Sequence, residues 1–463
     1  MLRRIAAAVA AAAVFAAPGA ARAAQPLDLR AAVRFALDHD PAVLARRATV
    51  AQNEATFAKD HASEFPAVAA TLQNQLAKNN GASGGQFQQF GLSQTQVFSQ
   101  NVAQVGATWN LYNGSLAQIQ TQQAKRQVES SRFDLRRAEQ QLAADVAAEW
   151  YAVVQQREAA RLADGDRAYQ QQLLDSARAQ ERVGRVAGVD VLRAQVNELR
   201  AEATLTSTRA AEANARETLA QRVGAPYDTA FAFPSSLPEP PPPRSTIDAL
   251  IAQALDARGD VASARAQVAV ARLTDAAIET DRRPQLQVTG AFGNSEVPST
   301  QTTGPRVISG LVIPGTTVNR AGFWQIGATE TLTLPLIEYG ARRAQHHAAR
   351  AQLDAALATL ASNESSVATD VRQAVRAVQT AAANLATSRE AGRLGAESAR
   401  IAQLQYRNGL ISLTDATAAE QSALASANDL VVAQVAYLNA LVRVRTAVGA
   451  ADPLTVVDLG APQ

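Results

Sequence analysis

Four short segments of the chain alternate between apolar and polar residues with a period of two. Leu72 and Gln73 are typical neighbours in the first of them, and Glu330 interrupts the apolar set of the last. Apolar residues occupy the odd positions of the second segment and the even positions of the other three. Such alternation is the pattern of a β-strand with one apolar and one polar face. The four predicted strands are 66–76, 104–112, 285–293 and 323–336.

The polar faces of these predicted strands carry Gln and Thr rather than Lys and Glu, and polar loops at 78–100 and 294–321 join them in pairs. Strands of a soluble sheet alternate in the same way, but an uncharged polar face over about ten residues favours a membrane barrel. The apolar positions should then face lipid, with Glu330 near the membrane edge. Four strands cannot close a barrel, because the smallest barrels have about eight. Since open edges are not stable in lipid, several chains would have to share one barrel.

Two stretches, 115–180 and 341–406, contain helix-forming residues almost throughout and no proline. Each predicts one continuous helix of roughly 100 Å, at about 1.5 Å per residue. Pro66 and Pro284 mark where helical patterns give way to strands, because proline cannot continue a helix. Beyond the first residues of the chain we expect no transmembrane helix.

The same elements occur twice in the same order, which indicates a duplicated unit. Shared residues return at the same distance along the chain: Gly184 as Gly409, and Asp190 as Asp415. The proline run within the segment between the units is expected to make it stiff and extended. The predicted organisation is a signal peptide at 1–23, a first repeat at 24–225, a Pro-rich linker at 226–245, a second repeat at 246–450 and a C-terminal tail at 451–463.

The beginning of the chain has the features of a secretory signal peptide. Arg3 and Arg4 precede a short apolar run, and Ala21-Arg22-Ala23 fits a cleavage site. The whole chain has a formal net charge of +2. Removal of the signal removes arginines and no acid, so the mature chain is close to neutral. This balance gives no reason to expect a nucleic-acid partner.

Residues that usually carry catalysis or hold metal ions are sparse in this chain. There is no cysteine, and there are only four histidines. Disulfides and a metal centre built from histidine and cysteine are therefore not expected. His346 and His347 are adjacent, and adjacent residues of a helix face different directions. With no nucleophile or phosphate-binding motif either, the sequence predicts neither an enzyme nor a cofactor.

The turns after the two long helices carry the most specific pattern. The first reads Val183-Gly184-Arg185-Val186-Ala187-Gly188-Val189-Asp190-Val191, and the second reads Tyr406-Arg407-Asn408-Gly409-Leu410-Ile411-Ser412-Leu413-Thr414-Asp415-Ala416. With the signal peptide, the duplicated helix–hairpin–helix unit and the linker, these turns resemble the TolC-like outer-membrane efflux proteins. That family supplies the outer-membrane factors of tripartite efflux and type I secretion systems. The resemblance covers essentially the whole mature chain.

The resemblance implies a mainly α fold with transmembrane β. As a homotrimer it would form a twelve-stranded β-barrel in outer-membrane lipid on a long periplasmic α-helical barrel. The implied function is a passive conduit for efflux or secretion that docks onto a periplasmic adaptor (membrane fusion) protein and an inner-membrane transporter. The alternative is a periplasmic or extracellular coiled-coil scaffold without a pore. Such a scaffold would need larger residues at a and d positions than these alanine-rich helices provide.

The resemblance also assigns roles to residues at the turns. Gly184 and Gly409 fit helix C-caps in left-handed conformation, and Asp415 fits a capping box with Ser412. The family would add adaptor docking and a periplasmic constriction to these structural roles. The implied docking tips are Val183, Gly184, Arg185, Asn408, Gly409 and Leu410, and the implied constriction residues are Asp415, Asp190, Arg182 and Tyr406.

Some residues depart from the family's pattern at the constriction. Tyr406 matches the tyrosine of the family's closed-state latch, but Arg182 stands where the latch has an aspartate. Ala418 occupies the position of a second acidic residue. Glu181 could pair with Arg407 in place of the latch, although solvated surface charge is the simpler expectation for both.

Overall fold

A computed structural model gives the fold of the chain. The residues it describes divide into two compact units, unit 1 within 27–48, 133–262 and 363–452, and unit 2 within Thr49–Arg132 and Ser263–Ser362. The expected signal peptide and nearly all of the expected C-terminal tail lie outside the described residues. The structure describes residues 27–81, 94–234, 236–242, 245–280, 282–296, 299–302, 306–308, 311–313, 317–318, 323–335, 340–450 and 452.

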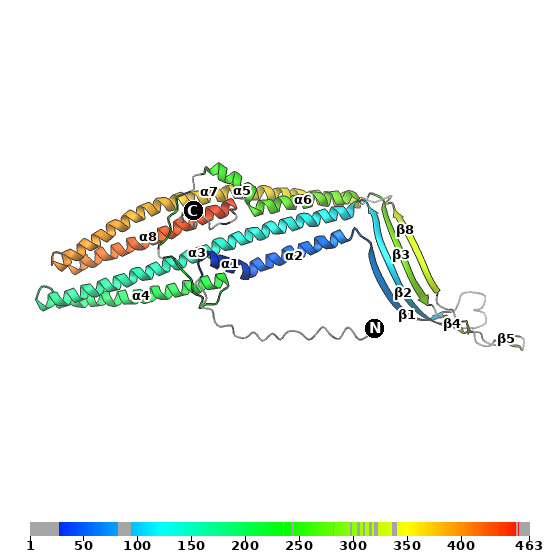
Figure 1. The fold of residues 1–463 in the computed structure, drawn as a ribbon, viewed down its shortest axis with the longest axis horizontal. Helices are drawn as coiled ribbons and strands as arrows, with labels where there is room; N and C mark the ends of the chain where they lie inside the picture. The colour runs from blue at the N-terminus through cyan, green and yellow to red at the C-terminus, as the bar shows by residue number, and fades with distance from the viewer. Residues whose placement is uncertain are drawn as a thin grey trace. The chain divides into compact units, whose positions relative to one another are not determined.

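The helices repeat the same order in both halves of the chain (Figure 1). Two shorter helices precede the strands of each half, and a long helix and a returning helix follow them. The two long helices have 67 residues each, as the proline-free stretches predict. The helices are α1 Leu29–His39, α2 Pro41–Ala62, α3 Leu116–Arg182, α4 Gly188–Val223, α5 Ile247–Ala257, α6 Gly259–Thr280, α7 Ala341–Arg407 and α8 Leu413–Val448.

Four long antiparallel strands, in the order β1-β2-β3-β8, form the main sheet of unit 2. Two short strands extend it, because β4 pairs with the outer part of β2 and β7 pairs with β4. Another two form a separate pair, β5 with β6. The strands are β1 Ala67–Gly81, β2 Gln94–Asn113, β3 Gln285–Glu296, β4 Ser299–Thr302, β5 Arg306–Ile308, β6 Leu311–Ile313, β7 Thr317–Val318 and β8 Phe323–Thr333.

The register of the sheet places the predicted apolar positions of the four strands on one face, apart from Leu111, which lies in a register shift between Asn110 and Tyr112. Val105 of β2 stands opposite Ala70 of β1 and Phe292 of β3. Phe292 in turn stands opposite Ile326 of β8. Directly opposite residues of an antiparallel pair project from the same face. The odd positions of β2 therefore join the even positions of the other three strands, which confirms the predicted alternation.

The other face of the sheet carries the polar set. Thr289 of β3 stands opposite Thr108 of β2 and Thr329 of β8. Glu330 is on the apolar face, opposite Val288, and lies close to the end of β8. That position agrees with a place near the edge of an apolar band, while contact of this face with lipid stays a prediction.

Strands β1 and β2 extend further than their apolar pattern predicts. The sequence predicts a loop over 78–100, but β1 continues to Gly81 and β2 begins at Gln94. Residues 74–81 of β1 pair with residues 94–101 of β2 without a break. Backbone hydrogen bonds hold a strand pair whatever its side chains, so these polar segments read as a loop in the sequence although they are paired.

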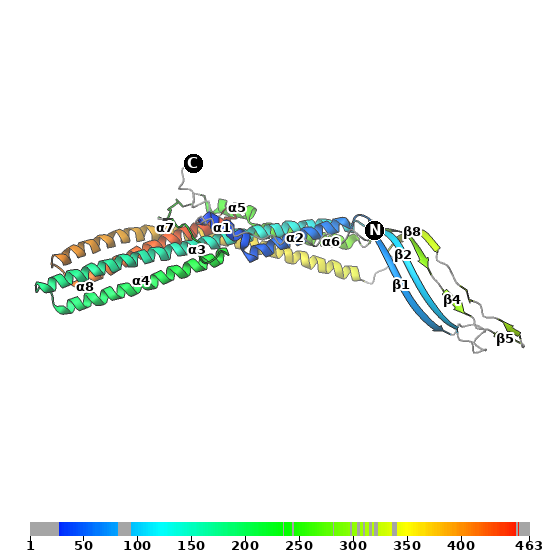
Figure 2. The ribbon, with the colours of Figure 1, turned by 60° about the horizontal axis from the view of Figure 1, so that its bottom comes forward.

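The core of unit 1 is built around Trp150 and Tyr151 of α3, whose side chains are fully buried. Helices α1, α4 and α8 contribute smaller apolar residues to this core, such as Val33, Leu219 and Leu438. In both views the helices α3, α4, α7 and α8 lie side by side towards the two turns (Figure 2). Several of the sparse aromatic residues thus lie in this one core, where smaller apolar residues of the neighbouring helices surround them.

The segment predicted as a stiff linker is held against the helices of unit 1. Phe231 and Phe233 both lie against the ring of Trp150, with ring centroids 6.0 and 4.6 Å away. The Tyr437 hydroxyl donates to the carbonyl of Pro240 at 2.6 Å. Leu27, just after the expected signal peptide, forms a parallel bridge with Phe231. The described part of the linker is therefore part of the packed structure, while its predicted stiffness stays a prediction.

Although we expect no transmembrane helix, α8 has the length and apolarity to cross a bilayer. An 18-residue window within Leu413–Val448 reaches a mean hydropathy of 1.2. However, 67% of that window is buried inside the structure. Its apolar residues, including Val435, Leu438 and Val442, pack in the core around Trp150. The apolarity of α8 is thus explained by helix packing.

Candidate functional site

Both turns between the long and the returning helices have the same backbone geometry. Gly184 and Gly409 have φ of 69° and 74°, in the left-handed region. The Gly184 N–H donates to the Glu181 carbonyl, and the Arg185 N–H donates to the Gln180 carbonyl, both at 2.9 Å. Gly409 and the residue after it make the equivalent pair of bonds, also at 2.9 Å. These are Schellman C-caps, so the predicted C-cap role of both glycines is confirmed.

The predicted docking residues at these turns face open space. A Cβ added to Gly184 or Gly409 would meet no other atom within 4 Å. The side chains of Val183 and Leu410 are 67% and 72% exposed. Apolar side chains this exposed at the end of a helical hairpin are free to contact another molecule.

Asp415 forms the predicted capping box at the start of α8. The Ser412 hydroxyl accepts from the Asp415 N–H at 3.1 Å, and the Ser412 N–H donates to the Asp415 carboxylate at 3.4 Å. The Ser412 hydroxyl also donates to that carboxylate at 2.7 Å. Asp415 remains exposed despite these bonds. Its capping role is confirmed, and its charge is still available at the surface.

The first turn holds its charged residues differently. The N-cap of α4 is Ala187, which makes no side-chain capping bond. Asp190 instead lies 3.7 Å from Arg193 on the same helix. Arg182 is exposed and donates to the Arg178 carbonyl at 3.4 Å. Arg182 is therefore held against its own helix, and its role at a constriction stays a prediction.

Tyr406 is buried beside this first turn. Its side chain lies in a cluster with Leu173 of α3, Ala194 of α4 and Ala416 of α8. Its hydroxyl has no hydrogen-bond partner among the residues that the structure describes. Burial raises the pKa of Tyr406, and the negative charge of Asp190 raises it further. Among the predicted constriction residues, the structure thus brings Tyr406 and Asp190 together. Arg407, a possible partner of Glu181, donates to Gln172 at 3.4 Å.

Three residues near Tyr406 form an acidic cluster that the sequence does not reveal. Burial raises the pKa of Glu420, and the charge of Asp166 adds to that effect. Burial and then Glu420 raise the pKa of Tyr169 to about 12. The Tyr169 hydroxyl is buried, and no described residue forms a hydrogen bond with it. These residues come from α3 and α8, so no local motif could have identified them.

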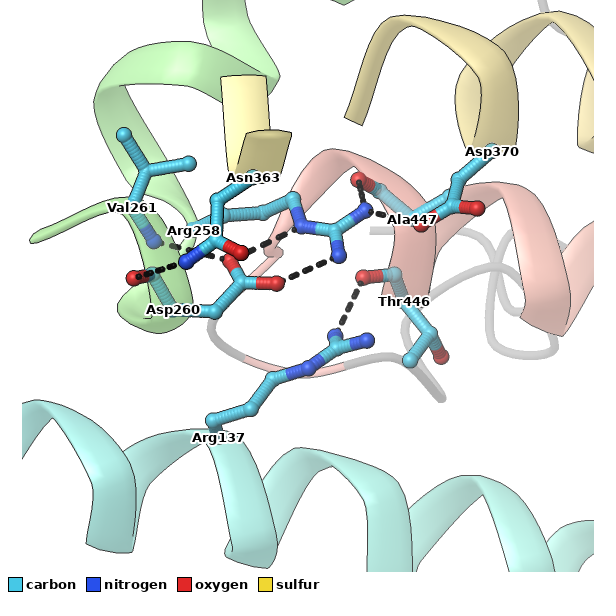
Figure 3. A network of polar contacts seen from close by, with 8 residues as sticks. All are labelled: Arg137, Arg258, Asp260, Val261, Asn363, Asp370, Thr446 and Ala447. Carbon is cyan, nitrogen blue, oxygen red and sulfur yellow. Dashed lines mark hydrogen bonds and ion pairs between the residues drawn. The ribbon is translucent and has the colours of Figure 1, made fainter. Parts of the chain in front are cut away.

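A buried polar network binds the C-terminal carbonyls of α8 in unit 1 (Figure 3). Arg258, whose side chain is only 4% exposed, bridges Asp260 at 2.5 Å and Asp370 at 2.9 Å. Its guanidinium and that of Arg137 donate to carbonyls in the last turn of α8, at 3.5 and 3.1 Å. Cations at a helix C-terminus are favourable because the helix dipole is negative there. Burial opposes ionisation of Asp260, but Arg258 outweighs it and lowers the pKa of Asp260.

Of the two adjacent histidines, His346 contacts two carboxylates of α6. His346 lies between Asp275 and Glu279, with both nitrogen–oxygen distances at 2.9 Å. Within the described residues, no group of three or more His, Cys, Asp or Glu side chains has the arrangement of a metal site.

One family of known sequences matches most of the chain. The model of the family described as outer membrane efflux protein matches residues 32–225 and 250–450.

The chain belongs to the outer membrane efflux protein family.

No curated protein sequence matches the chain. This outer membrane efflux protein is similar in fold to several solved outer-membrane channels. CmeC of Campylobacter jejuni is 17% identical with a TM-score of 0.71, over 91% of this chain and 85% of that one. VceC of Vibrio cholerae is 16% identical with a TM-score of 0.69, over 91% and 96%. MtrE of Neisseria gonorrhoeae, solved in an open state, is 19% identical with a TM-score of 0.71, over 92% and 89%.

Family membership decides between the alternatives that the sequence leaves open. The chain is an outer-membrane efflux protein with a large periplasmic part, and it is a channel protein rather than an enzyme. A scaffold without a pore does not fit this family. The duplicated helix–hairpin–helix fold predicted from the sequence is confirmed.

Proposed function

We propose that three copies of this chain assemble into one passive channel from the periplasm to the exterior, for efflux or secretion. Their sheets would form a twelve-stranded barrel in outer-membrane lipid. Their long and returning helices, α3, α4, α7 and α8, would form the wall of a periplasmic tunnel. The proposed chain organisation is a signal peptide at 1–23, repeats at 24–225 and 246–450, the linker at 226–245 and the tail at 451–463.

The main support for this proposal is that the sheet has two open edges. Within the described residues, β1 pairs only with β2, and β8 pairs only with β3. The sheet also has one exposed apolar face, on which Leu72 is 86% and Ile326 is 84% exposed. An apolar face suits lipid, but unpaired backbone groups at a sheet edge do not. Pairing β1 of one copy with β8 of the next satisfies both edges and leaves the apolar face outside.

Electrophoresis of detergent-extracted outer membranes tests the assembly. We expect a species of three chains in unheated samples and a single chain after heating, because closed barrels resist detergent until heated. Purified protein should conduct ions across a planar bilayer without an energy source. A single chain in unheated samples would overturn the trimer, and a trimer that does not conduct would overturn the conduit.

We propose further that the two turns dock onto a periplasmic adaptor, which links the channel to an inner-membrane transporter. The exposure of Val183 and Leu410 and the open space at both glycines support this role. Asp415, Asp190 and Tyr406 would lie at the periplasmic constriction, with Arg182 as an exposed cation on the same turn region. Both roles place interacting groups at the ends of the hairpins, where Asp415 is exposed and Tyr406 is buried between the helices.

A pair of glycines allows the docking role to be separated from folding. Gly409 and Gly449 have nearly the same φ, 74° and 76°. A Cβ at Gly449 would approach the backbone of Ala257 to 3.0 Å, whereas one at Gly409 meets nothing within 4 Å. We expect Gly409→Leu to keep the trimer and to lose co-purification with the adaptor and efflux. Gly449→Ala should instead lower the yield of folded trimer. Normal adaptor binding by Gly409→Leu would contradict the docking role.

A further inference from the structure

Helix α4 carries a long heptad stripe that none of the described residues covers. Every position of this stripe is exposed, although its first part is strongly apolar. Val196 is 46% exposed and Leu199 is 55% exposed. Spacings of three and four residues are those of the a and d positions that pack between helices. The stripe consists of Val189, Leu192, Val196, Leu199, Ala203, Thr206, Ala210 and Ala213.

Helix α7 carries a second exposed stripe with the same spacing. Ile401 is 42% exposed, Leu404 is 46% exposed and Leu394 is 54% exposed. The stripe also contains two carboxylates, at Glu390 and Glu397. Its members are Leu404, Ile401, Glu397, Leu394, Glu390 and Thr387, all exposed. Both stripes are therefore richest in large apolar residues near the turns and lose them further along.

The heights of the two stripes can be compared within unit 1. Ala194 of α4 and Tyr406 of α7 belong to the same buried cluster, so they lie at about the same level. The two helices run in opposite directions, since α4 leaves its turn and α7 approaches its own. Two residues further from the turns than Ala194 and Tyr406, Val196 of α4 lies level with Leu404 of α7. Five residues further, Leu199 lies level with Ile401. A rotation about an axis along the helices preserves these levels between copies.

At these levels the two stripes match in antiparallel register. Each a position of one stripe meets a d position of the other, which is the layering of an antiparallel helix pair. The large residues meet large ones in the first two layers. Further along, Ala203 meets Glu397 and Ala210 meets Glu390, so no large apolar side chain lies against a carboxylate. Glu397 and Glu390 already pair with Arg400 and Arg393 of their own helix, at 2.7 and 2.6 Å, so neither carboxylate would enter the contact as an unpaired charge.

A groove continues beyond the end of the α7 stripe. It has a volume of about 850 Å³ and lies between α7 and α8. Small side chains such as Ala377, Thr380 and Ala436 line it, with Arg443 at its wall. Exposed Glu217, one heptad step after Ala210 on α4, reaches the level of this groove and has the charge to pair with Arg443. Small residues permit close approach of a neighbouring helix.

We propose that the α4 stripe of one copy packs against the α7 stripe of the next copy, and that this seam joins the chains below the membrane. The inference rests on the proposed trimer and specifies which surfaces meet. A water-filled tunnel gives no reason for Val196, Leu199, Ile401 and Leu404 to be apolar. Contact between copies removes these side chains from water, which is the main favourable term in helix association.

Disulfide cross-linking tests the seam directly, because the chain contains no cysteine of its own. A disulfide forms only when two Cα atoms come within roughly 7 Å. One chain would carry Leu199→Cys and one tag, and a co-expressed chain would carry Ile401→Cys and another tag. The control replaces Ile401→Cys by Thr387→Cys, about 21 Å further along the same stripe. We expect an oxidised dimer with both tags for the first combination and none for the control.

The other outcomes separate the seam from the proposed channel. If a heat-labile trimer forms but neither combination cross-links, the seam is wrong while the trimer stands. If no trimer forms in the wild-type chain, both proposals fail. A single chain that carries both Leu199→Cys and Ile401→Cys could also be oxidised. A disulfide formed only within that chain would overturn the seam.

Charged substitutions on the two stripes test the seam a second time, without oxidation. Leu199→Glu should lower the detergent-resistant trimer fraction about tenfold or more, because it buries an unpaired charge. Adding Ile401→Lys should restore most of the trimer. If Leu199→Glu leaves the trimer intact and removes adaptor binding, the stripe faces the adaptor and the seam between copies is refuted.

Discussion

The two repeats of this chain use the same backbone at equivalent places and hold it with different side chains. Both long helices end in a Schellman C-cap on glycine. The second repeat then starts its returning helix with the Ser412–Asp415 capping box, whereas the first starts at Ala187 with no side-chain cap. Asp190, the counterpart of Asp415, pairs with Arg193 instead. Duplication thus preserved the turns, while the charges around them acquired separate roles.

The junctions between the shorter helices differ in the same manner. In the first repeat, Asp40 accepts hydrogen bonds from the backbone of Ala42 and Val43 at 2.9 and 3.0 Å. In the second, Arg258 takes the equivalent position and forms the buried network with two aspartates. An exposed helix cap has been replaced by a buried ion cluster. The two repeats therefore serve as controls for one another.

The largest expected difference is between these two junctions. Arg258→Ala leaves two aspartates without their buried partner and should cost about 3–5 kcal/mol of unfolding free energy. Asp40→Ala removes one cap and should cost about 1 kcal/mol. Denaturant unfolding of the purified protein, followed by circular dichroism, measures both. Equal losses would contradict the distinction between the repeats at this junction.

The strands of the two repeats should instead behave alike. Leu72→Arg and Val288→Arg place a charge on the shared apolar face and should each cost about 2–4 kcal/mol near the middle of the membrane. Gln73→Arg and Thr289→Arg alter the polar face and should be tolerated. The amount of heat-labile trimer in outer membranes reports the effect. Equal tolerance of all four variants would refute a membrane-facing apolar surface.

The two turn aspartates should differ by a smaller amount. Asp415→Ala loses the capping box and should cost about 1 kcal/mol, whereas Asp190→Ala loses one exposed ion pair, which is worth about 0.5 kcal/mol or less. Asp415→Asn keeps most of the cap, because asparagine caps nearly as well. If Asp415 lies at the constriction, this variant should reduce cation selectivity in single-channel recordings, and Arg182→Ala should increase it. Unchanged selectivity would leave Asp415 with capping alone.

The smallest expected effect depends on pH. Glu420 corresponds to Gln195 of the first repeat, and burial and Asp166 raise the pKa of Glu420. A carboxyl with a raised pKa favours the folded state when protonated, and this contribution is lost as pH rises through the folded pKa. Glu420→Gln should therefore raise the melting temperature at pH about 8 and make no difference near pH about 4. A gain that is equal at both pH values would contradict this assignment.

Elements with a strong local pattern could be predicted from the sequence. The strand faces follow from alternation at positions such as Val105 and Phe292, and the helix ends follow from Gly184 and Gly409. Asp415 was also predictable, because a capping box lies within four consecutive residues. In each case the deciding interaction is between residues close in the chain or repeated with a fixed period.

Features that depend on packing between distant segments could not be predicted in this way. The cluster of Tyr169 and Glu420 joins α3 to α8. The network of Arg258 joins the start of α6 to α7 and α8. The outer parts of β1 and β2 are polar and appear as a loop, although backbone pairing makes them strands. The apolar α8 resembles a membrane span because the sequence does not show what covers it.

The two unpaired sheet edges have a consequence for biogenesis. A lone chain that entered the bilayer would expose the backbone of β1 and β8 to hydrocarbon, where each unsatisfied group costs several kcal/mol. In the proposed trimer, insertion and association would then be a single event, in contrast to barrels that one chain can close. The rate of insertion should rise more steeply than linearly with the concentration of the periplasmic precursor. Dilution of that precursor would slow its delivery to the membrane before it affected any finished channel.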